Sequence, residues 1–483
     1  MRMKKDCGVL KTVMKFGGTS VGNGARIRQV VNIIKDHVDR GTKVVVVVSA
    51  MNDVTDNILR VAEAVATGNH EVIGQVVAKL ASRHTQAAKE VLLDREVLRI
   101  TVEQIEGLLE EFKQVLTSVS TLTELTPRSK DYLLSFGEKL STTLVHGGLL
   151  EAGIPARFFT GGEAGLVTND DYGAAVPLLK VTAHRVRETL SPLLADGITP
   201  VVTGYIASTQ DDVTTTLGRG GSDYTATLLG YALDVDEVWI WTDVEGLMTA
   251  DPKIEPSAKT ITSISYSEAM ELVYFGAKAM HPKALEPALE KEIPVRIKNT
   301  FNPASPGTSI GKNRAVISKN VAKAVTVIWD AALITVGGAG MIGTPGVAAQ
   351  VFGILGENHV NILMISQSSS EANISIIIRR GDLEKAVNLL ELAFLGKGMI
   401  REVTFDEDIC VIAVVGAGMR GSVGVAARIF TAVAGQGVNV KVIAQGSSEL
   451  NVSFVVSEKD GANAVRALHH EFQLASQETQ KSL

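Results

Sequence analysis

The chain has 483 residues, more than one hydrophobic core usually supports, so about three domains are expected. With 45% hydrophobic and 21% charged residues, the composition is that of a folded globular protein. A net charge of −6 and 5% aromatic residues do not favour nucleic-acid binding. The two distant cysteines exclude a disulfide framework, and no apolar run reaches the length of a membrane helix or leader, so a cytoplasmic location is expected.

The first three hundred residues alternate short β-branched runs with helical patterns, which is typical of a mostly parallel sheet covered by helices. The strands are predicted at 12–16, 43–49, 200–205, 237–242 and 294–298. A long helical insert is predicted from 56 to 151, with charged faces that pack and solubilise. A Pro- and Gly-rich stretch at 301–307 marks the exit of this domain, and 311–323 is predicted to be a linker.

The last part of the chain contains an internal repeat. Residues 334–375 align with 412–453 at a constant offset of 78 without a gap, and Gly338-Ala-Gly-Met341 recurs as Gly416-Ala-Gly-Met419. Each copy predicts a strand, a Gly-rich turn, a helix (347–357 in the first copy), two strands (361–366 and 373–379) and a second helix from 382. This order favours a small α+β unit of ferredoxin-like type.

Two Gly-rich segments carry chemistry. In Lys15-Phe-Gly-Gly-Thr-Ser20 a strand ends in glycines and hydroxyls before a helix, with a lysine beside them. This pattern fits phosphate binding and an ordinary tight turn about equally. In the segment 214–224, Arg219 and Asp223 flank a backbone of minimal side chains before another helix, a combination that favours an anion site over a structural turn.

Two other segments are ambiguous by themselves. The segment 242–253 follows a predicted strand, where open α/β sheets place ligand loops, although alone it is an ordinary polar loop. The segment 275–282 brings Lys278 next to a glycine, and by itself this lysine would be a solvated surface residue.

Several nucleotide-binding and metal-binding classes are excluded. The chain has neither a P-loop motif nor a protein-kinase motif set. Both 338–343 and 416–421 match G-x-G-x-x-G, yet the following strands lack a terminal acidic residue and the repeats are too short for a dinucleotide domain. The histidines show no metal-ligand spacing.

Taken together, the motifs resemble those of the aspartate kinases, a family of the amino-acid kinase superfamily. The segments that carry the resemblance are Lys15-Phe-Gly-Gly-Thr-Ser20, Ser49-Ala-Met-Asn-Asp-Val-Thr55, Ser135-Phe-Gly-Glu138, Thr216-Leu-Gly-Arg-Gly-Gly-Ser-Asp-Tyr224, Thr242-Asp243 and Phe275-Gly-Ala-Lys278. The resemblance implies an α/β catalytic domain at 1–310 and two ferredoxin-like ACT domains at 324–405 and 406–483. A fused homoserine dehydrogenase is not expected, because the chain ends shortly after the second ACT unit.

The resemblance implies transfer of the γ-phosphoryl of ATP to the side-chain carboxylate of L-aspartate, which gives 4-phospho-L-aspartate, the entry to lysine, threonine and methionine. An ionised carboxylate needs no general base, so catalysis reduces to alignment and charge neutralisation. Lys15 and Lys278 are expected to hold the phosphoryl group, Asp223 to orient the lysines, and Mg²⁺ to bridge the nucleotide phosphates. Nucleotide contacts are expected from Gly17, Gly18, Gly220, Gly221, Thr242, Asp243, Met248 and Lys253.

The same resemblance assigns the amino-acid substrate site. Arg219 is expected to bind the α-carboxylate as a forked donor, and Glu138 to bind the α-ammonium. Without the family motif, Glu138 would be read as a carboxylate on a helix surface. The remaining expected contacts are the hydroxyls of Ser49, Thr55 and Ser222 and the aromatic ring of Tyr205.

The ACT units imply feedback control by an end-product amino acid and a homodimer or homotetramer that forms through these domains. The effector is expected at Met341, Ile342, Gly343, Thr344, Pro345, Gly346, Val347, Ala348, Asn361 and Gln367. The Gln-x-Ser-Ser-Glu segments, 367–371 and 445–449, favour threonine over lysine as effector, although such a turn also closes a hairpin. The first copy is expected to dominate, because Thr344-Pro345 is replaced by Ser422-Val423 in the second.

Two alternatives stay open. One is another kinase of the same superfamily, which the pairing of Glu138 with Arg219 opposes, because these charges suit a zwitterionic amino acid. The other is a regulator without catalysis, which the presence of Lys15, Asp223 and Lys278 opposes.

Overall fold

The computed structural model describes residues 9–277, 280–312, 321–395 and 400–476, which form two compact units. The first consists of Met1–Leu247, Thr262–Tyr266 and Ala279–Asn313, and the second of Met248–Ile261, Ser267–Lys278 and Arg314–Leu483. The described residues of two segments, 248–261 and 267–277, which the sequence analysis places in the catalytic domain, therefore pack with the repeats instead.

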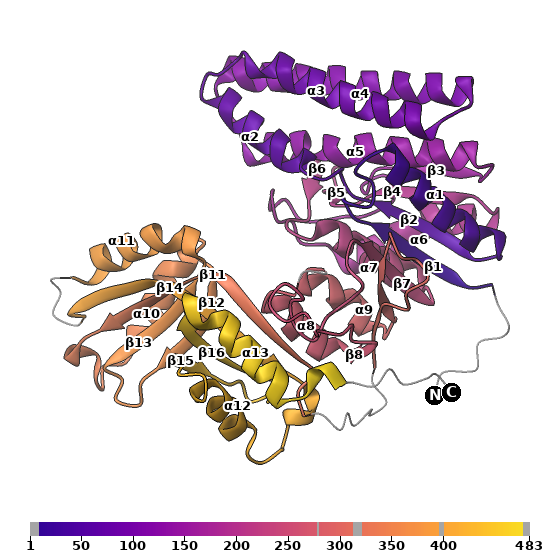
Figure 1. Ribbon diagram of the computed structural model, residues 1–483. Coiled ribbons are helices and arrows are strands. Elements are labelled where there is room, and N and C mark those ends of the chain that lie inside the picture. Colours follow the sequence, from indigo (N-terminus) through magenta and orange to yellow (C-terminus); the bar gives the residue numbers. More distant parts are fainter. Residues whose placement is uncertain (1–8, 278–279, 313–320, 396–399, 477–483) are drawn as a thin grey trace. The chain divides into compact units, whose positions relative to one another are not determined.

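The first unit is built on an eight-stranded sheet with the strand order β3-β4-β2-β1-β7-β9-β10-β8 (Figure 1). Its strands are β1 (Lys11–Phe16), β2 (Lys43–Val48), β3 (Ala156–Phe159), β4 (Thr199–Thr203), β7 (Glu237–Thr242), β8 (Ser263–Ser265), β9 (Val295–Asn299) and β10 (Thr308–Gly311). All neighbours from β3 to β9 are parallel, and β10 is antiparallel to β9. The predicted mostly parallel sheet is confirmed, and the central β2 is an unbroken valine run, as burial on both faces requires.

Helices cover this sheet and form the long insert. They are α1 (Gly24–Asp39), α2 (Val54–Ala66), α3 (Val72–Val91), α4 (Arg95–Leu122), α5 (Pro127–Glu151), α6 (Leu179–Ala195), α7 (Gly221–Leu233), α9 (Glu286–Glu290) and the 3₁₀ turn Pro282–Leu285. A small hairpin, β5 (Ile206–Ser208) and β6 (Thr214–Thr216), lies before α7. The predicted helical insert corresponds to α2–α5.

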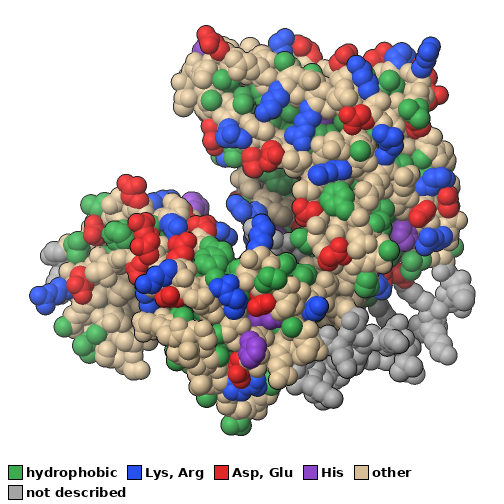
Figure 2. Space-filling view, viewed as in Figure 1, with side chains coloured by type: hydrophobic (Ala, Val, Ile, Leu, Met, Phe, Trp, Pro, Cys, Tyr) green, Lys and Arg blue, Asp and Glu red, His purple; other side chains and the backbone are tan. Residues whose placement is uncertain are grey.

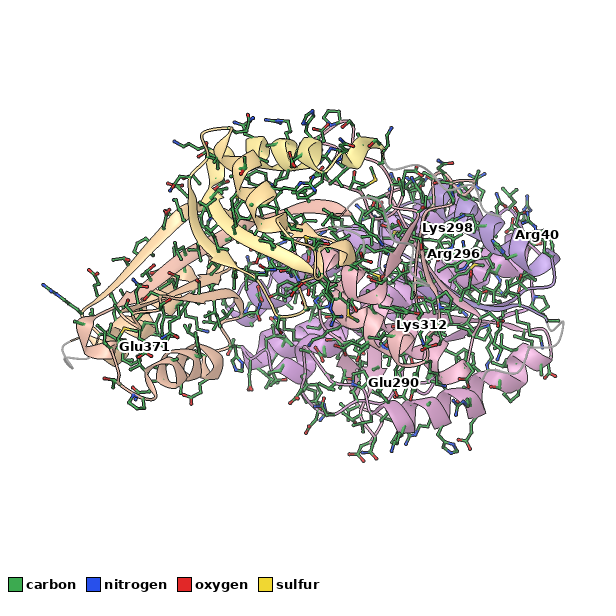
Figure 3. All side chains as sticks on the ribbon, turned by 90° about the horizontal axis from the view of Figure 1, so that it is seen from below. Arg40, Glu290, Arg296, Lys298, Lys312 and Glu371 are labelled. Atoms are coloured by element: carbon green, nitrogen blue, oxygen red, sulfur yellow. The ribbon has the colours of Figure 1, made fainter. Side chains whose placement is uncertain are left out.

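Opposite charges lie interspersed on the outer faces of the insert and of the sheet. On α4, Arg99 forms exposed ion pairs with Glu96 and Glu103, and Figure 2 shows both signs distributed over the α3–α4 region. On the sheet, Arg296 of β9, which is labelled in Figure 3, donates two hydrogen bonds to Glu237 of β7, of 2.8 and 2.9 Å. The α4 pairs lie on a solvated face, as the sequence analysis expects of the insert, whereas the Arg296–Glu237 pair is partly buried.

The second unit contains the two repeats on one antiparallel sheet with the order β12-β13-β11-β14-β16-β15. The first repeat runs β11 (Ala324–Gly337), α10 (Val347–Glu357), β12 (Ile362–Gln367), β13 (Asn373–Ile378) and α11 (Leu383–Phe394). The second runs β14 (Glu402–Val415), α12 (Val425–Ala434), β15 (Val440–Ala444), β16 (Asn451–Ser457) and α13 (Gly461–Glu471). The predicted order of elements in each copy is confirmed.

The two repeats are interleaved through their long first strands. The offset of 78 relates the whole of β11 to the whole of β14, and the pairing of Ala324 with Val415 is mirrored by that of Gly337 with Glu402. The start of β11 contributes Val325 to the core of the second repeat, while Val403 of β14 packs against the core of the first. Boundaries at 324 and 406 therefore divide the sequence, but they do not divide the two cores.

Helix α8 (Tyr266–Tyr274) is attached to the second repeat by a buried carboxylate. Glu268 is fully buried, forms a 3.0 Å ion pair with Lys323 and accepts a 2.7 Å hydrogen bond from the Ala417 backbone. Lys323 and the fully buried Ala322 belong to the stretch predicted as a linker, so the end of that stretch is part of the core. Within the described ranges, no helix combines the length and apolar character needed to cross a membrane.

We predict that Glu268→Ala destabilises the second unit, because it removes the anion from a buried ion pair and an acceptor from the Ala417 amide. Breaking a buried pair from one side costs about 3–5 kcal/mol. Denaturant unfolding, with hydrogen exchange at the Ala417 amide, measures the effect. The control is Glu471→Ala, which removes a half-exposed pair with Arg428 and should cost less than about 1 kcal/mol. Equal stability of the two variants would contradict the prediction.

Candidate active site

The site of the first unit lies where its central parallel strands end. Backbone hydrogen bonds join the segments that follow these strands: Gly17 donates to Trp241 at 3.1 Å, Ser49 to Phe16 at 3.1 Å, and Gly204 to Val48 at 2.8 Å. Loops at the carboxyl ends of parallel strands thus converge on one edge of the sheet, where open α/β sheets place ligands.

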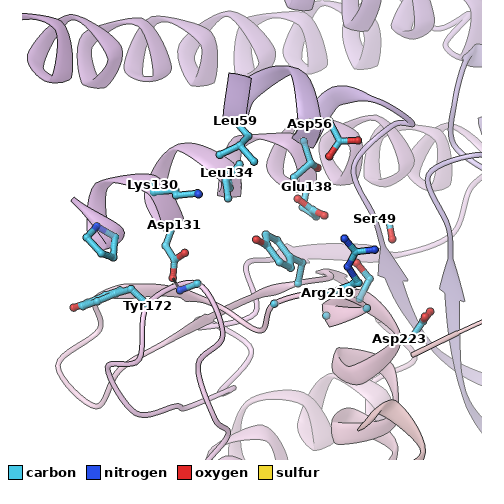
Figure 4. A pocket seen from close by; sticks show the side chains of 18 of the residues that line it. Ser49, Asp56, Leu59, Lys130, Asp131, Leu134, Glu138, Tyr172, Arg219 and Asp223 are labelled. Atoms are coloured by element: carbon cyan, nitrogen blue, oxygen red, sulfur yellow. Dashed lines mark hydrogen bonds between the residues drawn. The ribbon is translucent and has the colours of Figure 1, made fainter. Parts of the chain in front are cut away.

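A cavity of about 1040 Å³ opens at this edge and contains most of the predicted catalytic and substrate residues (Figure 4). The predicted residues that line it are Lys15, Ser49, Thr55, Glu138, Tyr205, Arg219, Gly220, Gly221, Ser222 and Asp223. They come from β1, the loop after β2, α2, α5, the segment after β4 and the start of α7. Segments up to about two hundred residues apart therefore form one concave surface with charges of both signs.

A buried ion pair connects the two Gly-rich segments. The Lys15 ammonium lies 2.5 Å from a carboxylate oxygen of Asp223, and the two side chains are 10% and 8% exposed. Lys15 is near the end of β1, and Asp223 lies in the first turn of α7. The pair holds a cation at the cavity wall, where an incoming phosphate could contact it.

Close packing accounts for two of the glycines. A Cβ on Gly18 would lie 2.7 Å from the Ala50 carbonyl oxygen, and Gly220, with φ +75°, would place a Cβ 2.1 Å from the Cβ of His281. Gly220 precedes α7, so the helix can begin directly beneath the cavity. Gly17 and Gly18 lie in the turn after β1 but are not among the residues that line the cavity.

Glu138 lies on α5, which begins with Thr126 as its N-cap and Pro127 in its first turn. Burial raises the pKa of Glu138 to about 8, against the opposing effect of a hydrogen bond from the Ala50 backbone. Its Oε2 atom is buried without a hydrogen-bond partner. The preceding Gly137 allows this approach, since a Cβ there would lie 2.9 Å from the Ala50 Cβ. Glu138 is thus a buried acceptor that a cationic ligand would satisfy.

Arg219 faces the same space as Glu138 (Figure 4). Beside it, Tyr205 has φ +66°, and its ring lies so close to Gly221 that a Cβ there would approach it to 2.7 Å. Burial raises the pKa of Tyr205 to about 12, so the phenol is neutral at physiological pH. Ser222 is buried in the first turn of α7, against Gly204. The cavity therefore presents a forked cation, an unsatisfied carboxylate and neutral hydroxyls.

Some predicted nucleotide residues lie outside the cavity lining. Thr242 is the last residue of β7 and Asp243 follows it, and the Thr242 hydroxyl donates to Asp243 at 3.2 Å. Met248 and Lys253 belong to the second compact unit. Lys278 lies outside the described residues. The nucleotide assignments of these residues stay predictions.

The cavity also has walls that the sequence analysis missed. These additional lining residues are Asp56, Leu59, Glu63, Leu125, Pro127, Lys130, Asp131, Leu134, Tyr172, Gly173 and Gly218. Two of them had a usable signal in the sequence. Gly218 lies within the Gly-rich segment 214–224, and Asp131 precedes Glu138 by seven residues, which places both on one face of a helix.

A second, smaller cavity of about 300 Å³ lies in the first repeat at the turn that follows β11. The predicted effector residues that line it are Met341, Gly343, Thr344, Pro345, Gly346, Val347, Ala348 and Gln367. Ile342 and Asn361 are not among its lining residues. Glu371, which the sequence analysis did not assign, closes the cavity by accepting a 3.0 Å hydrogen bond from the Gly343 backbone (Figure 3).

The second repeat has the same turn geometry. Gly421 donates to Glu449 at 2.6 Å, as Gly343 does to Glu371, and the hydroxyls of Ser422 and Thr344 bond the equivalent carbonyls at 2.6 and 2.8 Å. The exchange of threonine for serine therefore leaves the fold of the turn unchanged. The two turns differ in their surroundings, because the turn of the second copy also bonds Glu268 of α8.

The described side chains form no cluster suited to a metal ion. Within the part of the chain that the structure describes, no group of three or more His, Cys, Asp or Glu side chains could hold a metal ion.

Comparison with known proteins defines the class. Residues 11–299 match the model of the amino acid kinase family, and residues 334–394 and 412–472 each match the model of an ACT domain. Chloroplastic aspartokinase 2 of Arabidopsis thaliana is 35% identical over 473 residues, which cover 96% of this chain and 84% of that protein. Chloroplastic aspartokinase 1 of the same plant is 34% identical over 468 residues, or 95% and 80% of the two proteins.

Solved structures agree with this class. The structure of E. coli aspartokinase III in complex with aspartate and ADP superposes with a TM-score of 0.81 and 29% identity, covering 96% of this chain and 99% of that one. The complex of the same enzyme with lysine and aspartate gives a TM-score of 0.78 over 95% and 99%. These matches define a phosphotransferase of the amino acid kinase family with a carboxyl group as acceptor and paired ACT domains. Within that family, the chain belongs to the aspartokinases.

We predict that Glu138→Gln stabilises the first unit at alkaline pH. Between the ordinary pKa of 4.5 and the raised value of about 8, the folded state keeps a proton that the unfolded state releases, so stability falls as pH rises through this window. Glutamine removes a penalty on the order of 3–5 kcal/mol. The melting temperature of Glu138→Gln should match that of the wild type at pH 5 and exceed it at pH 9. Glu106→Gln, on an exposed position of α4, should follow the wild type at both pH values.

Proposed function

We propose that this protein transfers the γ-phosphoryl group of ATP to the side-chain carboxylate of L-aspartate, with 4-phospho-L-aspartate as product. The observation that carries the proposal is the single cavity in which Arg219 and the unsatisfied Glu138 lie with the Lys15–Asp223 pair. The E. coli relative was solved with aspartate and ADP, which supports both substrates. As a pathway assignment, the reaction is proposed as the first step toward lysine, threonine and methionine.

Charge placement accounts for the chemistry. The acceptor carboxylate is already ionised at neutral pH, so no general base is needed, and the barrier falls when charge on the transferring group is neutralised. Lys15 is the described cation for this task, and Asp223 fixes its position. Lys278 is proposed as the second lysine from its motif alone. Mg²⁺, when bound to the nucleotide, supplies further neutralisation of phosphate charge.

Substrate recognition follows from the remaining groups. The planar guanidinium of Arg219 suits the α-carboxylate, and Glu138, once ionised, suits the α-ammonium. Because burial holds the pKa of Glu138 near 8, binding of a cationic ammonium favours the ionised form and releases a proton at neutral pH. The hydroxyls of Ser49, Thr55 and Ser222 and the ring of Tyr205 complete the proposed set.

Regulation by an amino acid is proposed at the smaller cavity of the first repeat. E. coli aspartokinase III was solved with lysine, which supports an amino-acid effector in general. Threonine remains our preferred effector from the Gln-Ser-Ser-Ser-Glu segment, with lysine second. We also propose a homodimer or homotetramer through the ACT sheet, whose edge strands expose Ile365 and Ile443. The expected cytoplasmic location stays a prediction, and the plant relatives are chloroplastic by name.

We predict that Lys15→Ala abolishes turnover. An acyl phosphate reacts with hydroxylamine, so hydroxamate formation with ATP and a panel of amino acids reports the reaction directly. The wild type should respond to aspartate, and Lys15→Ala should lose about 3 kcal/mol or more of transition-state stabilisation, a factor of at least about a hundred in kcat. Lys35→Ala, an exposed position of α1, is the control. A folded Lys15→Ala enzyme with near-normal kcat would remove the assignment, and no hydroxamate from the wild type with any amino acid would favour a non-catalytic regulator.

Arg219→Lys is predicted to raise the KM for aspartate strongly and to leave the KM for ATP nearly unchanged. A point ammonium cannot form the two parallel hydrogen bonds of a guanidinium with a carboxylate. Initial rates over a matrix of both substrates give the two constants. A selective loss of ATP affinity would place Arg219 in the nucleotide site instead.

For regulation, we predict that Gln367→Ala weakens inhibition by threonine much more than Gln445→Ala does, with uninhibited activity unchanged. Gln367 lines the small cavity of the first repeat, while the turn of the second repeat also bonds Glu268. Inhibition curves with threonine and with lysine test this. If both variants lost inhibition by threonine equally, both repeats would contribute to effector binding. Inhibition by lysine alone would rule out threonine as the effector.

A further inference from the structure

Asp131 is a fully buried carboxylate in the wall of the main cavity, and none of the roles proposed above uses it. Three donors surround it. Its Oδ2 atom accepts hydrogen bonds of 2.9 Å from the backbone amides of Gly173 and Thr216, and its Oδ1 atom accepts one of 2.8 Å from the Thr216 hydroxyl. The donors lie 42 and 85 residues away in sequence, so this carboxylate joins three separate segments.

These segments carry the two groups proposed to hold the amino acid. Asp131 precedes Glu138 by seven residues on α5, two helical turns along the same face. Thr216 ends β6 and precedes Arg219 by three residues. In Figure 4 the Asp131 side chain points from α5 toward the loop that contains Tyr172. Asp131 therefore links the helix that carries Glu138 to the segment that carries Arg219.

Other contacts stiffen the same junction. Ala175 donates to the Thr216 carbonyl at 2.9 Å, and the hydroxyls of Thr168 and Thr215 are 2.7 Å apart. A Cβ on Gly218 would lie 3.2 Å from the Gly173 carbonyl, so the Arg219 segment packs directly on the Gly173 loop. Removal of the Asp131 carboxylate would break the hydrogen bonds that hold Thr216, three residues before Arg219, and would leave the Lys15–Asp223 ion pair intact.

We propose that Asp131 is a positioning residue that sets the separation between Glu138 and Arg219 and thereby selects the four-carbon substrate. This inference rests on the proposed function. Once the α-ammonium and α-carboxylate are held, side-chain length alone decides where the acceptor carboxylate lies relative to Lys15. Glutamate, with one more methylene, would carry its carboxylate past the transfer position, and a misplacement of about 1 Å can cost about a hundredfold in rate.

The test compares Asp131→Asn with two variants of its partner. Asparagine replaces one acceptor oxygen with an amide group that faces donors. Thr216→Val removes the hydroxyl that bonds both Asp131 and Tyr205, and Thr216→Ser retains this hydroxyl as the matched control. Hydroxamate assays give kcat and KM for aspartate, KM for ATP, and kcat/KM for glutamate. Melting temperatures show whether each variant is folded.

We expect Asp131→Asn to raise the aspartate KM about tenfold and to lower the preference for aspartate over glutamate by a similar factor, with the ATP KM unchanged. Thr216→Val should shift both quantities in the same direction by less, and Thr216→Ser should match the wild type. An unchanged preference in folded Asp131→Asn or Thr216→Val enzyme, or a parallel loss of ATP affinity, would overturn the proposal. Failure of the wild type to respond to aspartate would instead overturn the proposed function.

Discussion

The arrangement of the first unit depends on one constraint, that charge removed from water must be paired. Lys15 is held in a largely buried position by Asp223, and this pair joins the end of β1 to the beginning of α7. If the two ends were not held together, a lysine at the end of a central strand would be costly to bury. In the same Gly-rich segments, Gly18 and Gly220 allow close packing against Ala50 and His281. Glu138 shows the opposite condition, a buried carboxylate without a full set of partners, and its raised pKa reflects the cost of burying its charge.

Much of this site could be predicted from the sequence because its parts are local patterns at strand ends. Lys15, Arg219 and Asp223 each stand beside glycines at a turn into a helix, and parallel strands bring such turns to one edge. The Gly173 loop could not be predicted, since no motif marks it and its position depends on a hydrogen bond to a helix 42 residues away. Helix α8 was missed for a related reason: its 9-residue pattern is short, and its packing partner lies almost one hundred and fifty residues later.

In the second unit, the offset of 78 residues predicted two equivalent repeats and the order of their elements. Both predictions are confirmed. The offset did not predict which strand completes which core, because that choice depends on pairing between copies and not on the pattern within one copy. The sequence analysis therefore assigns residues from 324 onward to the first ACT domain, although Val325 packs in the core of the second repeat. Because both repeats share one sheet, a displacement of β11 relative to β14 would change the packing of both cores. This geometry suits a conformational change that couples the two repeats.

The exchange of strand ends between β11 and β14 also constrains how such a protein can change over time. The core of the second repeat includes Val325 from the start of β11, and Val403 from the start of β14 packs against the core of the first repeat. A deletion of either copy would therefore leave the survivor without part of its sheet and with an exposed apolar edge. Recombination that moves a single copy into another gene would carry an incomplete fold. The pair is thus inherited as one module, and we expect new specificities to arise by substitution within its two turns rather than by gain or loss of a copy.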